Sequence, residues 1–81
     1  MTVTIELIGE DFTLEVEKGD SVYSVKYMIY GILSIKPAQQ KLTYQDQMME
    51  NDKTMAFYNV KEGSIIHLSI WSSGSGAVRE I

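Results

Sequence analysis

The chain has 81 residues, a formal net charge of −4 and no cysteine. This length supports one small domain with a single core, and the lack of cysteine excludes disulfides, thiolate metal sites and thiol catalysis. The sequence shows no basic stripe of the kind that nucleic-acid binders carry, and no apolar run of membrane-spanning length. We therefore expect neither a nucleic-acid partner nor a membrane partner.

The N-terminal part of the chain alternates between apolar and polar side chains in two runs. Residues 2–8 place Val3, Ile5 and Leu7 on one face, which predicts a half-buried strand. Residues 9–11 predict a short turn, and residues 12–17 alternate in the same way as a second strand. The two runs predict a hairpin with one apolar face, and that face needs a cover.

Residues 20–34 predict the only long helix, which would supply this cover. Ser21 suits the N-cap because its hydroxyl can accept a hydrogen bond from an unpaired N–H of the first turn. At roughly 100° per residue, a core-facing stripe is made by Val22, Val25, Ile29, Ile32 and Leu33. Three tyrosines fall within about 60° of one another on a different side of the helix: Tyr23, Tyr27 and Tyr30. Folding alone does not require them there, so this side is a candidate partner-binding surface.

The second half of the chain predicts shorter elements. Pro37 ends any helical continuation, and a strand over residues 41–44 is followed by a turn and a brief strand at residues 48–49. A helical turn over residues 54–58 then leads to a last strand over residues 64–70. This order predicts an α+β roll, a mixed sheet with one main helix packed across it. We expect a folded domain over residues 1–71 and a flexible Gly/Ser tail or linker over residues 72–81.

The order and spacing of these elements resemble ubiquitin, and several short motifs lie at matching separations. They are TLEVE (13–17), Asp20, VK (25–26), Ile29, QQKL (39–42), END (50–52), YNV (58–60) and IHL (66–68). The resemblance runs from Met1 to about Ile70 and implies the ubiquitin-like β-grasp fold. It also implies that the Tyr58 hydroxyl bonds the backbone near Glu50.

The departures from ubiquitin concern conjugation. A conjugated modifier needs a flexible tail that ends in Gly-Gly, whereas this sequence contains no Gly-Gly and has Trp71 where ubiquitin has the arginine read by its activating enzyme. Gln47 and Glu62 stand where ubiquitin carries its two main chain-forming lysines. The resemblance thus implies a non-covalent protein–protein interaction module, a domain of a larger protein. The alternative is a modifier that is matured by proteolysis and conjugated.

The resemblance also locates the sheet face that most ubiquitin receptors bind. The matching positions are Thr43 and Ser69, which flank His67, with Ile8 near the hairpin turn. Because aliphatic anchors dominate small interfaces, their loss predicts a weakened site on this face. His67 on an outer face is more often a solvated histidine than a ligand or base. Phe57 and Trp71 are further candidate contacts, although either ring can instead fold back on the domain.

Two modes of binding fit the tyrosines of the helix. The predicted second strand is a sheet edge in this fold, and a partner strand added to it would place its side chains against the tyrosines, similar to the way SUMO reads peptide motifs. Alternatively, the tyrosines dock a neighbouring domain of the same chain. We expect the partner to be a ubiquitin-system or proteasome component, or such a neighbouring domain.

Enzymatic activity is not expected from this sequence. It has one histidine, no phosphate-binding loop and no ligand set with metal spacing, so we expect no catalytic residue, no cofactor and no metal. The N-terminus alternates and does not resemble a signal peptide. We therefore expect a monomeric domain located in the cytoplasm or nucleus.

Overall fold

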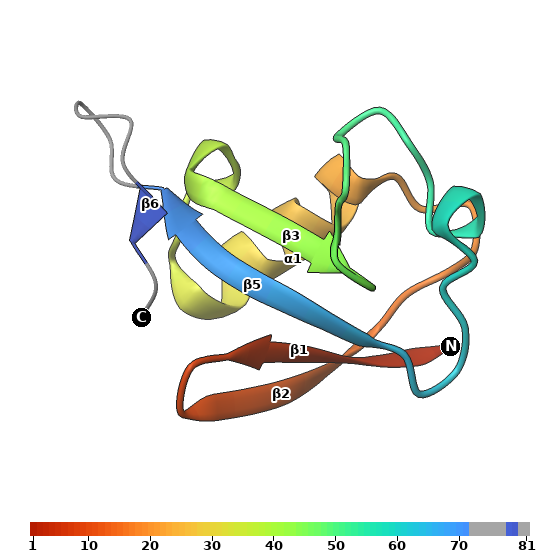
Figure 1. Cartoon of the computed structure of the whole chain (residues 1–81), viewed down its shortest axis with the longest axis horizontal. Coiled ribbons are helices and arrows are strands. Elements are labelled where there is room, and N and C mark those ends of the chain that lie inside the picture. Colours follow the sequence, from red (N-terminus) through yellow and green to blue (C-terminus); the bar gives the residue numbers. More distant parts are fainter. Residues whose placement is uncertain (72–77, 80–81) are drawn as a thin grey trace.

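A computed structural model describes residues 1–71 and 78–79 of the chain (Figure 1). Its elements in chain order are β1 (Thr2–Leu7), β2 (Glu10–Glu15), α1 (Val22–Leu33), η1 (Pro37–Gln39), β3 (Gln40–Tyr44), β4 (Gln47–Met48), η2 (Ala56–Tyr58), β5 (Ile65–Trp71) and β6 (Val78–Arg79). The strands form one sheet in the order β2-β1-β5-β3-β4, with β6 paired to the end of β5. The β1–β5 pair is parallel and the other pairs are antiparallel, so the sheet is mixed.

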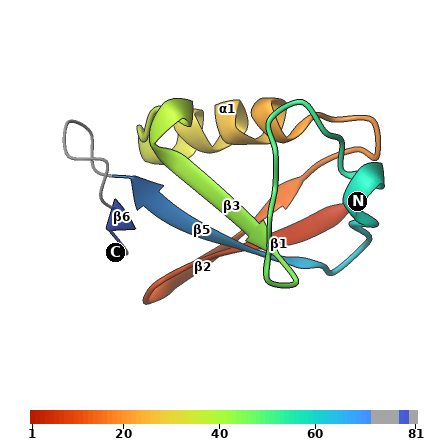
Figure 2. The same ribbon diagram turned by 45° about the horizontal axis from the view of Figure 1, so that its top comes forward.

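Helix α1 covers one face of this sheet, as predicted (Figure 2). The alternating residues of the strands point toward it and are buried, as are three apolar residues of the helix itself. This core includes Val3, Ile5, Leu7, Leu42, Tyr44, Ile66 and Leu68 from the sheet and Val22, Val25 and Ile29 from α1. Met49 and Met55 close it from the connecting segment. The mixed sheet with one helix packed across it confirms the α+β roll.

The turn of the N-terminal hairpin is shorter than the sequence predicted, since β1 ends one residue earlier and β2 begins two residues earlier. Leu7 pairs with Glu10, so Ile8 and Gly9 form a two-residue turn and β2 begins at Glu10. Gly9 has a φ of 82°, which glycine adopts without steric cost. The carboxylates of Glu10 and Asp11 therefore belong to the strand end and not to the loop.

The rotation of α1 about its own axis differs from the prediction at one apolar position. Val22, Val25 and Ile29 are fully buried, but Ile32 is 53% exposed, so its assignment to the core is wrong. Lys26 is buried in its place, on the other side of the stripe. The helix is turned so that Lys26 faces the segment that follows β4, and this rotation brings Ile32 out to solvent.

The C-terminal strand β6 was not anticipated. Its residues Val78 and Arg79 pair with Trp71 and Ile70 at the end of β5. The Gly/Ser segment over residues 72–76, on which the linker prediction depends, lies outside the described residues. The expected division into residues 1–71 and 72–81 stays a prediction.

Candidate functional site

Two capping serines position the tyrosines on α1. The Ser21 hydroxyl accepts a hydrogen bond from the Ser24 N–H at 3.0 Å, which confirms Ser21 as the N-cap. Ser34 ends the helix in the left-handed conformation, and its N–H donates to the Tyr30 carbonyl at 2.9 Å. Between these caps the helix is regular, so residues three or four apart lie next to each other on its surface.

The three tyrosines form one continuous row on the helix surface. Tyr23 is 49% exposed, Tyr27 58% and Tyr30 38%. Ring centroids lie 6.2 Å apart between Tyr23 and Tyr27, and 5.8 Å apart between Tyr27 and Tyr30, the latter pair edge to face. Each ring thus packs on its neighbour and still shows surface to solvent, and the structure brings the predicted helix-face residues together.

The exposed surface of α1 carries no charge. Six of its residues are exposed, namely Tyr23, Ser24, Tyr27, Tyr30, Gly31 and Ile32. The one charged residue in the helix, Lys26, is buried. Solvent-facing helix surfaces normally carry charged and polar side chains, so this uncharged surface is a candidate contact site. We call these six residues the helix face.

The tyrosines lie on the flank of α1 that faces away from β2. Lys26 follows Tyr23 by three residues and precedes Tyr30 by four, so it borders the tyrosine row. It also lines a recess with Gln40, Met49 and other residues of η1, β3 and the segment 48–52. Since β3 and β4 are at the opposite end of the sheet from β2, the flank nearest β2 is the one that carries Met28 and Ile32. Strand β2 is a sheet edge, as predicted, but the idea that a strand added there would contact the tyrosines is wrong.

Lys26 is an unusual buried cation. The residue is 7% exposed, and the described residues place no carboxylate oxygen within 4 Å of its ammonium group. Burial lowers the pKa of Lys26 below its ordinary value of 10.5, because the low-polarity surroundings disfavour the charged form. Beside it, the Gln40 amide donates to the carbonyls of Lys26 and Ile35 at 2.8 Å each. Gln40 thereby ties α1 to β3, a role that the sequence did not reveal.

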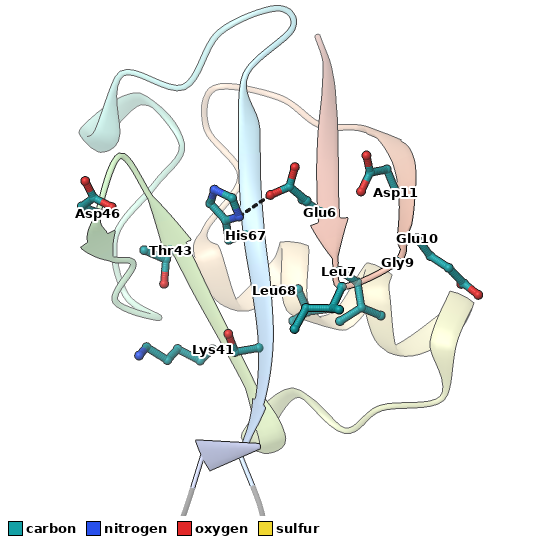
Figure 3. Close-up of a pocket in the computed structure, with 12 residues that line it drawn as sticks. Glu6, Leu7, Gly9, Glu10, Asp11, Lys41, Thr43, Asp46, His67 and Leu68 are labelled. Atoms are coloured by element: carbon teal, nitrogen blue, oxygen red, sulfur yellow. Dashed lines mark ion pairs between the residues drawn. The ribbon is translucent and has the colours of Figure 1, made fainter. Parts of the chain in front are cut away.

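The outer face of the sheet holds a shallow hollow of about 760 Å³ (Figure 3). Ile8, Thr43, His67 and Ser69, the four residues predicted for this face, all line it. Thr43 lies opposite His67 across the β3–β5 pair, and Ser69 lies opposite Lys41. The structure therefore brings this set together, with Ile8 as the one strongly exposed aliphatic side chain among the four, at 62%.

Carboxylates that the sequence reasoning missed dominate the same hollow. Glu6 lies opposite His67 across the parallel β1–β5 pair, and its Oε1 is 2.7 Å from His67 Nδ1 (Figure 3). Glu10, Asp11 and Asp46 add three more acidic groups to the lining. Strand register, which the sequence alone does not specify, places Glu6 beside His67. The result is a polar, acidic surface in place of an aliphatic one.

The two additional aromatic candidates lie apart from the helix face. Phe57 is 56% exposed, its ring packs edge to face on Tyr58 with centroids 5.0 Å apart, and the Lys53 Nζ lies 4.9 Å from its centre. Phe57 thus already holds a cation of its own chain. Trp71 ends β5, and its side chain lies outside the described part of the structure.

Neither a metal centre nor a membrane span is found in residues 1–71 and 78–79. No three His, Cys, Asp or Glu side chains among them gather closely enough to hold a metal ion. The helix present is too short to cross a bilayer. The candidate sites considered further are the helix face and the acidic hollow.

Comparison with known proteins assigns the chain to a family. A family model described as the ubiquitin family matches residues 1–72. The chain belongs to the ubiquitin family. The Tyr58–Glu50 contact implied by the resemblance to ubiquitin is present, since the Glu50 N–H donates to the Tyr58 hydroxyl at 2.7 Å.

Individual proteins match most of the chain at low identity. Ubiquitin D from Mus musculus is 35% identical over 66 residues, which is 82% of this chain and 41% of the relative. Ubiquitin-like protein 1 from Schizosaccharomyces pombe is 32% identical over 62 residues, covering 76% of this chain and 80% of the relative. The large proline-rich protein bag6-A from Xenopus laevis is 36% identical over 69 residues, 84% of this chain but 6% of the relative. The chain thus spans less than half the length of two of these three proteins.

Proposed function

We propose that this ubiquitin-like domain is a non-covalent protein-binding module that is not conjugated to substrates. Its main contact surface is the helix face, with Tyr23, Tyr27 and Tyr30 as the anchors. The partner is a ubiquitin-system or proteasome component, or a neighbouring domain of the same chain. The acidic hollow with Ile8, Thr43, His67 and Ser69 is a weaker second surface.

The absence of charge on the exposed helix face carries this proposal. Three tyrosines and one isoleucine are exposed to solvent there, and none of them belongs to the hydrophobic core. Tyrosine is enriched in protein interfaces because it combines a large apolar body with a polar tip. On the sheet, by contrast, the hollow presents carboxylates around Thr43 and His67, which does not suit an aliphatic partner surface.

The comparisons support a place within a larger protein. The match to bag6-A covers 6% of that protein, and the match to Ubiquitin D covers 41%. In both relatives the matched region is one part of a longer chain. The lack of cysteine fits a reducing compartment, in keeping with the proposed cytoplasmic or nuclear location.

The second candidate function is that of a conjugated modifier matured by proteolysis. It is favoured by the match to Ubiquitin-like protein 1, which extends over 80% of that relative. The sequence contains no Gly-Gly, the tail chemistry that conjugation requires. Catalysis by this chain is not part of either proposal, since its single histidine is exposed and paired with Glu6.

Site-specific photo-crosslinking in cells tests the proposed surface. A benzophenone amino acid at Tyr27 should capture a partner that the same group at Thr43 does not capture. The double variant Tyr23→Ser/Tyr30→Ser should abolish this capture, and the purified partner should bind the unmodified domain in calorimetry. Capture from Thr43 alone would contradict the helix face. A covalent adduct through the C-terminus, formed with ATP and activating enzyme and detected by mass spectrometry, would establish the modifier function instead.

A further inference from the structure

We propose that the tyrosine row of the helix face binds an uncharged, proline-rich segment of the partner protein, held in the extended polyproline II conformation. This goes further than the proposed function, on which it rests, because it names the kind of segment that the helix face takes. The hydrogen-bonding groups of α1, the spacing of its tyrosine rings, its lack of exposed charge and its short length all favour such a segment.

The main chain of α1 has no free hydrogen-bonding groups to offer along the helix face. Between the ends of an α-helix, backbone N–H and C=O groups bond to each other. At the first turn, where N–H groups are often unpaired, those of Val22 and Tyr23 donate to the carbonyls of residues 51 and 53. The N–H of Ser24 donates to the Ser21 hydroxyl. A partner strand therefore cannot pair with α1 as it pairs with the edge of a sheet.

The polar groups that the row does offer are the hydroxyls of Tyr23, Tyr27 and Tyr30. None of them makes a hydrogen bond within the described part of the chain. A tyrosine hydroxyl can donate to a main-chain carbonyl of a partner when that carbonyl is still free. A polyproline II segment meets this condition because it has no internal hydrogen bonds, whereas an α-helix has used nearly all of its carbonyls.

The spacing of the rings also suits this conformation. Tyr23 and Tyr30 are seven residues apart, which corresponds to about 10.5 Å along the helix axis. One turn of polyproline II contains three residues and rises by about 9.3 Å. Prolines three positions apart lie on the same side of the segment, so they can pack on these two outer rings. The Tyr27 ring, with its centroid 6.2 Å from that of Tyr23 and 5.8 Å from that of Tyr30, then contacts the residues between them.

The lack of charge and the small size of the helix face favour the same kind of segment. A charged partner group would lose water at this face without gaining a counter-charge, whereas proline side chains carry no charge. Helix α1 has 12 residues and is about 18 Å long, which is short for a standard interface between two globular domains. A segment that already has its bound conformation loses little freedom on binding, so a small contact is sufficient.

The composition of the chain shows that the segment comes from elsewhere. Its 81 residues contain one proline, Pro37, which begins η1. Neither these residues nor a second copy of them can supply several prolines in a row. Helix α1 forms an outer layer opposite the sheet (Figure 2), so a segment of another protein can run along it.

Titration of the isotope-labelled chain with decaproline, followed by NMR, tests the inference. Resonances of Tyr23, Tyr27 and Tyr30 should shift and saturate at submillimolar to millimolar peptide, as expected of a contact this small. A Gly/Ser peptide of the same length is flexible and has no proline rings. It should cause no saturable shift.

Two variants locate the contact. Tyr27→Ala should weaken decaproline binding at least about tenfold, the loss expected when one aromatic anchor is removed. It should remain folded, because Tyr27 is 58% exposed and alanine favours the helix. Phe57→Ala is the matched control, since it removes a ring of similar exposure, 56%, outside the helix face. This variant should bind decaproline like the unmodified chain.

The absence of saturable shifts at the three tyrosines with millimolar decaproline overturns the inference, as does binding that Tyr27→Ala leaves unchanged. The crosslinking test separates this failure from that of the proposed function. A partner captured at Tyr27 through a segment without proline keeps the helix face as the binding surface and refutes only the proline-rich ligand. Loss of both the capture and the decaproline binding refutes the helix face itself.

Discussion

The backbone N–H of Glu50 donates to the hydroxyl of Tyr58 at 2.7 Å, and the two residues are eight positions apart in the chain. Tyr58 is buried at 6% exposure and belongs to η2, while Glu50 follows the last sheet residues of the β3–β4 pair. One hydroxyl therefore holds the segment whose backbone also bonds α1, through Asn51 to Tyr23 and through Lys53 to Val22. The loop, η2 and the start of the helix are a single connected unit.

Tyr58→Phe should destabilise the domain by about 1–2 kcal/mol, because the Glu50 N–H loses its partner in a partly buried place. The melting temperature should fall by several degrees, and the Glu50 amide should exchange faster with deuterium. Tyr23→Phe removes an exposed hydroxyl and serves as the control, with no measurable change expected. Equal melting temperatures for Tyr58→Phe and the unmodified chain would show that the hydrogen bond contributes nothing.

Gly31→Ala should stabilise the domain by about 1 kcal/mol, because alanine has the higher helix propensity and the position is open. Chemical denaturation of a dilute sample measures this. Gly63→Ala is the matched comparison and should destabilise, because Gly63 has a φ of 83° that a residue with a Cβ adopts only under strain. A loss of stability in Gly31→Ala would mean that the helix packs more tightly at this point than the structure indicates.

Tyr23→Ser combined with Tyr27→Ser should change the free energy of unfolding by no more than about 0.5 kcal/mol, since both rings are about half exposed. Ile29→Ala on the same helix should cost about 2–5 kcal/mol, because Ile29 is fully buried in the core. Urea denaturation of both variants makes the comparison. A large loss in the tyrosine variant would assign the rings to the stability of the fold and remove the basis of the helix face.

Lys26→Met should raise the free energy of unfolding at neutral pH by about 1 kcal/mol, because it removes a buried ammonium group that has no carboxylate partner. The folded-state pKa of Lys26 is lowered by burial, while the unfolded chain keeps the ordinary value near 10.5. As pH rises through the folded-state pKa, the folded protein releases this proton before the unfolded chain does. The burial penalty therefore shrinks with rising pH.

The measurement for Lys26 is a set of denaturation curves from neutral to alkaline pH. The advantage of Lys26→Met over the unmodified chain should be largest at neutral pH and decline toward pH 10.5. Lys36→Met changes an exposed lysine and should show no such trend. An advantage that stays constant with pH would mean that the ammonium group remains solvated in the folded state.

Local patterns were sufficient for much of this fold. Alternation predicted β1, β2, β3 and β5 to within one or two residues, and a serine before an apolar stripe predicted the start of α1. The spacing of Tyr23, Tyr27 and Tyr30 predicted that they share one side of the helix, away from the core. These features follow from backbone geometry over a few residues, so they are readable without knowing what lies across the core.

Contacts between distant segments decided the rest. Whether Ile32 or Lys26 is buried depends on the rotation of α1 about its axis. That rotation depends on how α1 packs against η1, β3 and the segment 48–52, which lie beside Lys26. The proximity of Glu6 to His67 follows from the register of two strands that are sixty residues apart, which no local pattern encodes. The residue types on each surface were present in the chain, but only close packing determined which of them share a face.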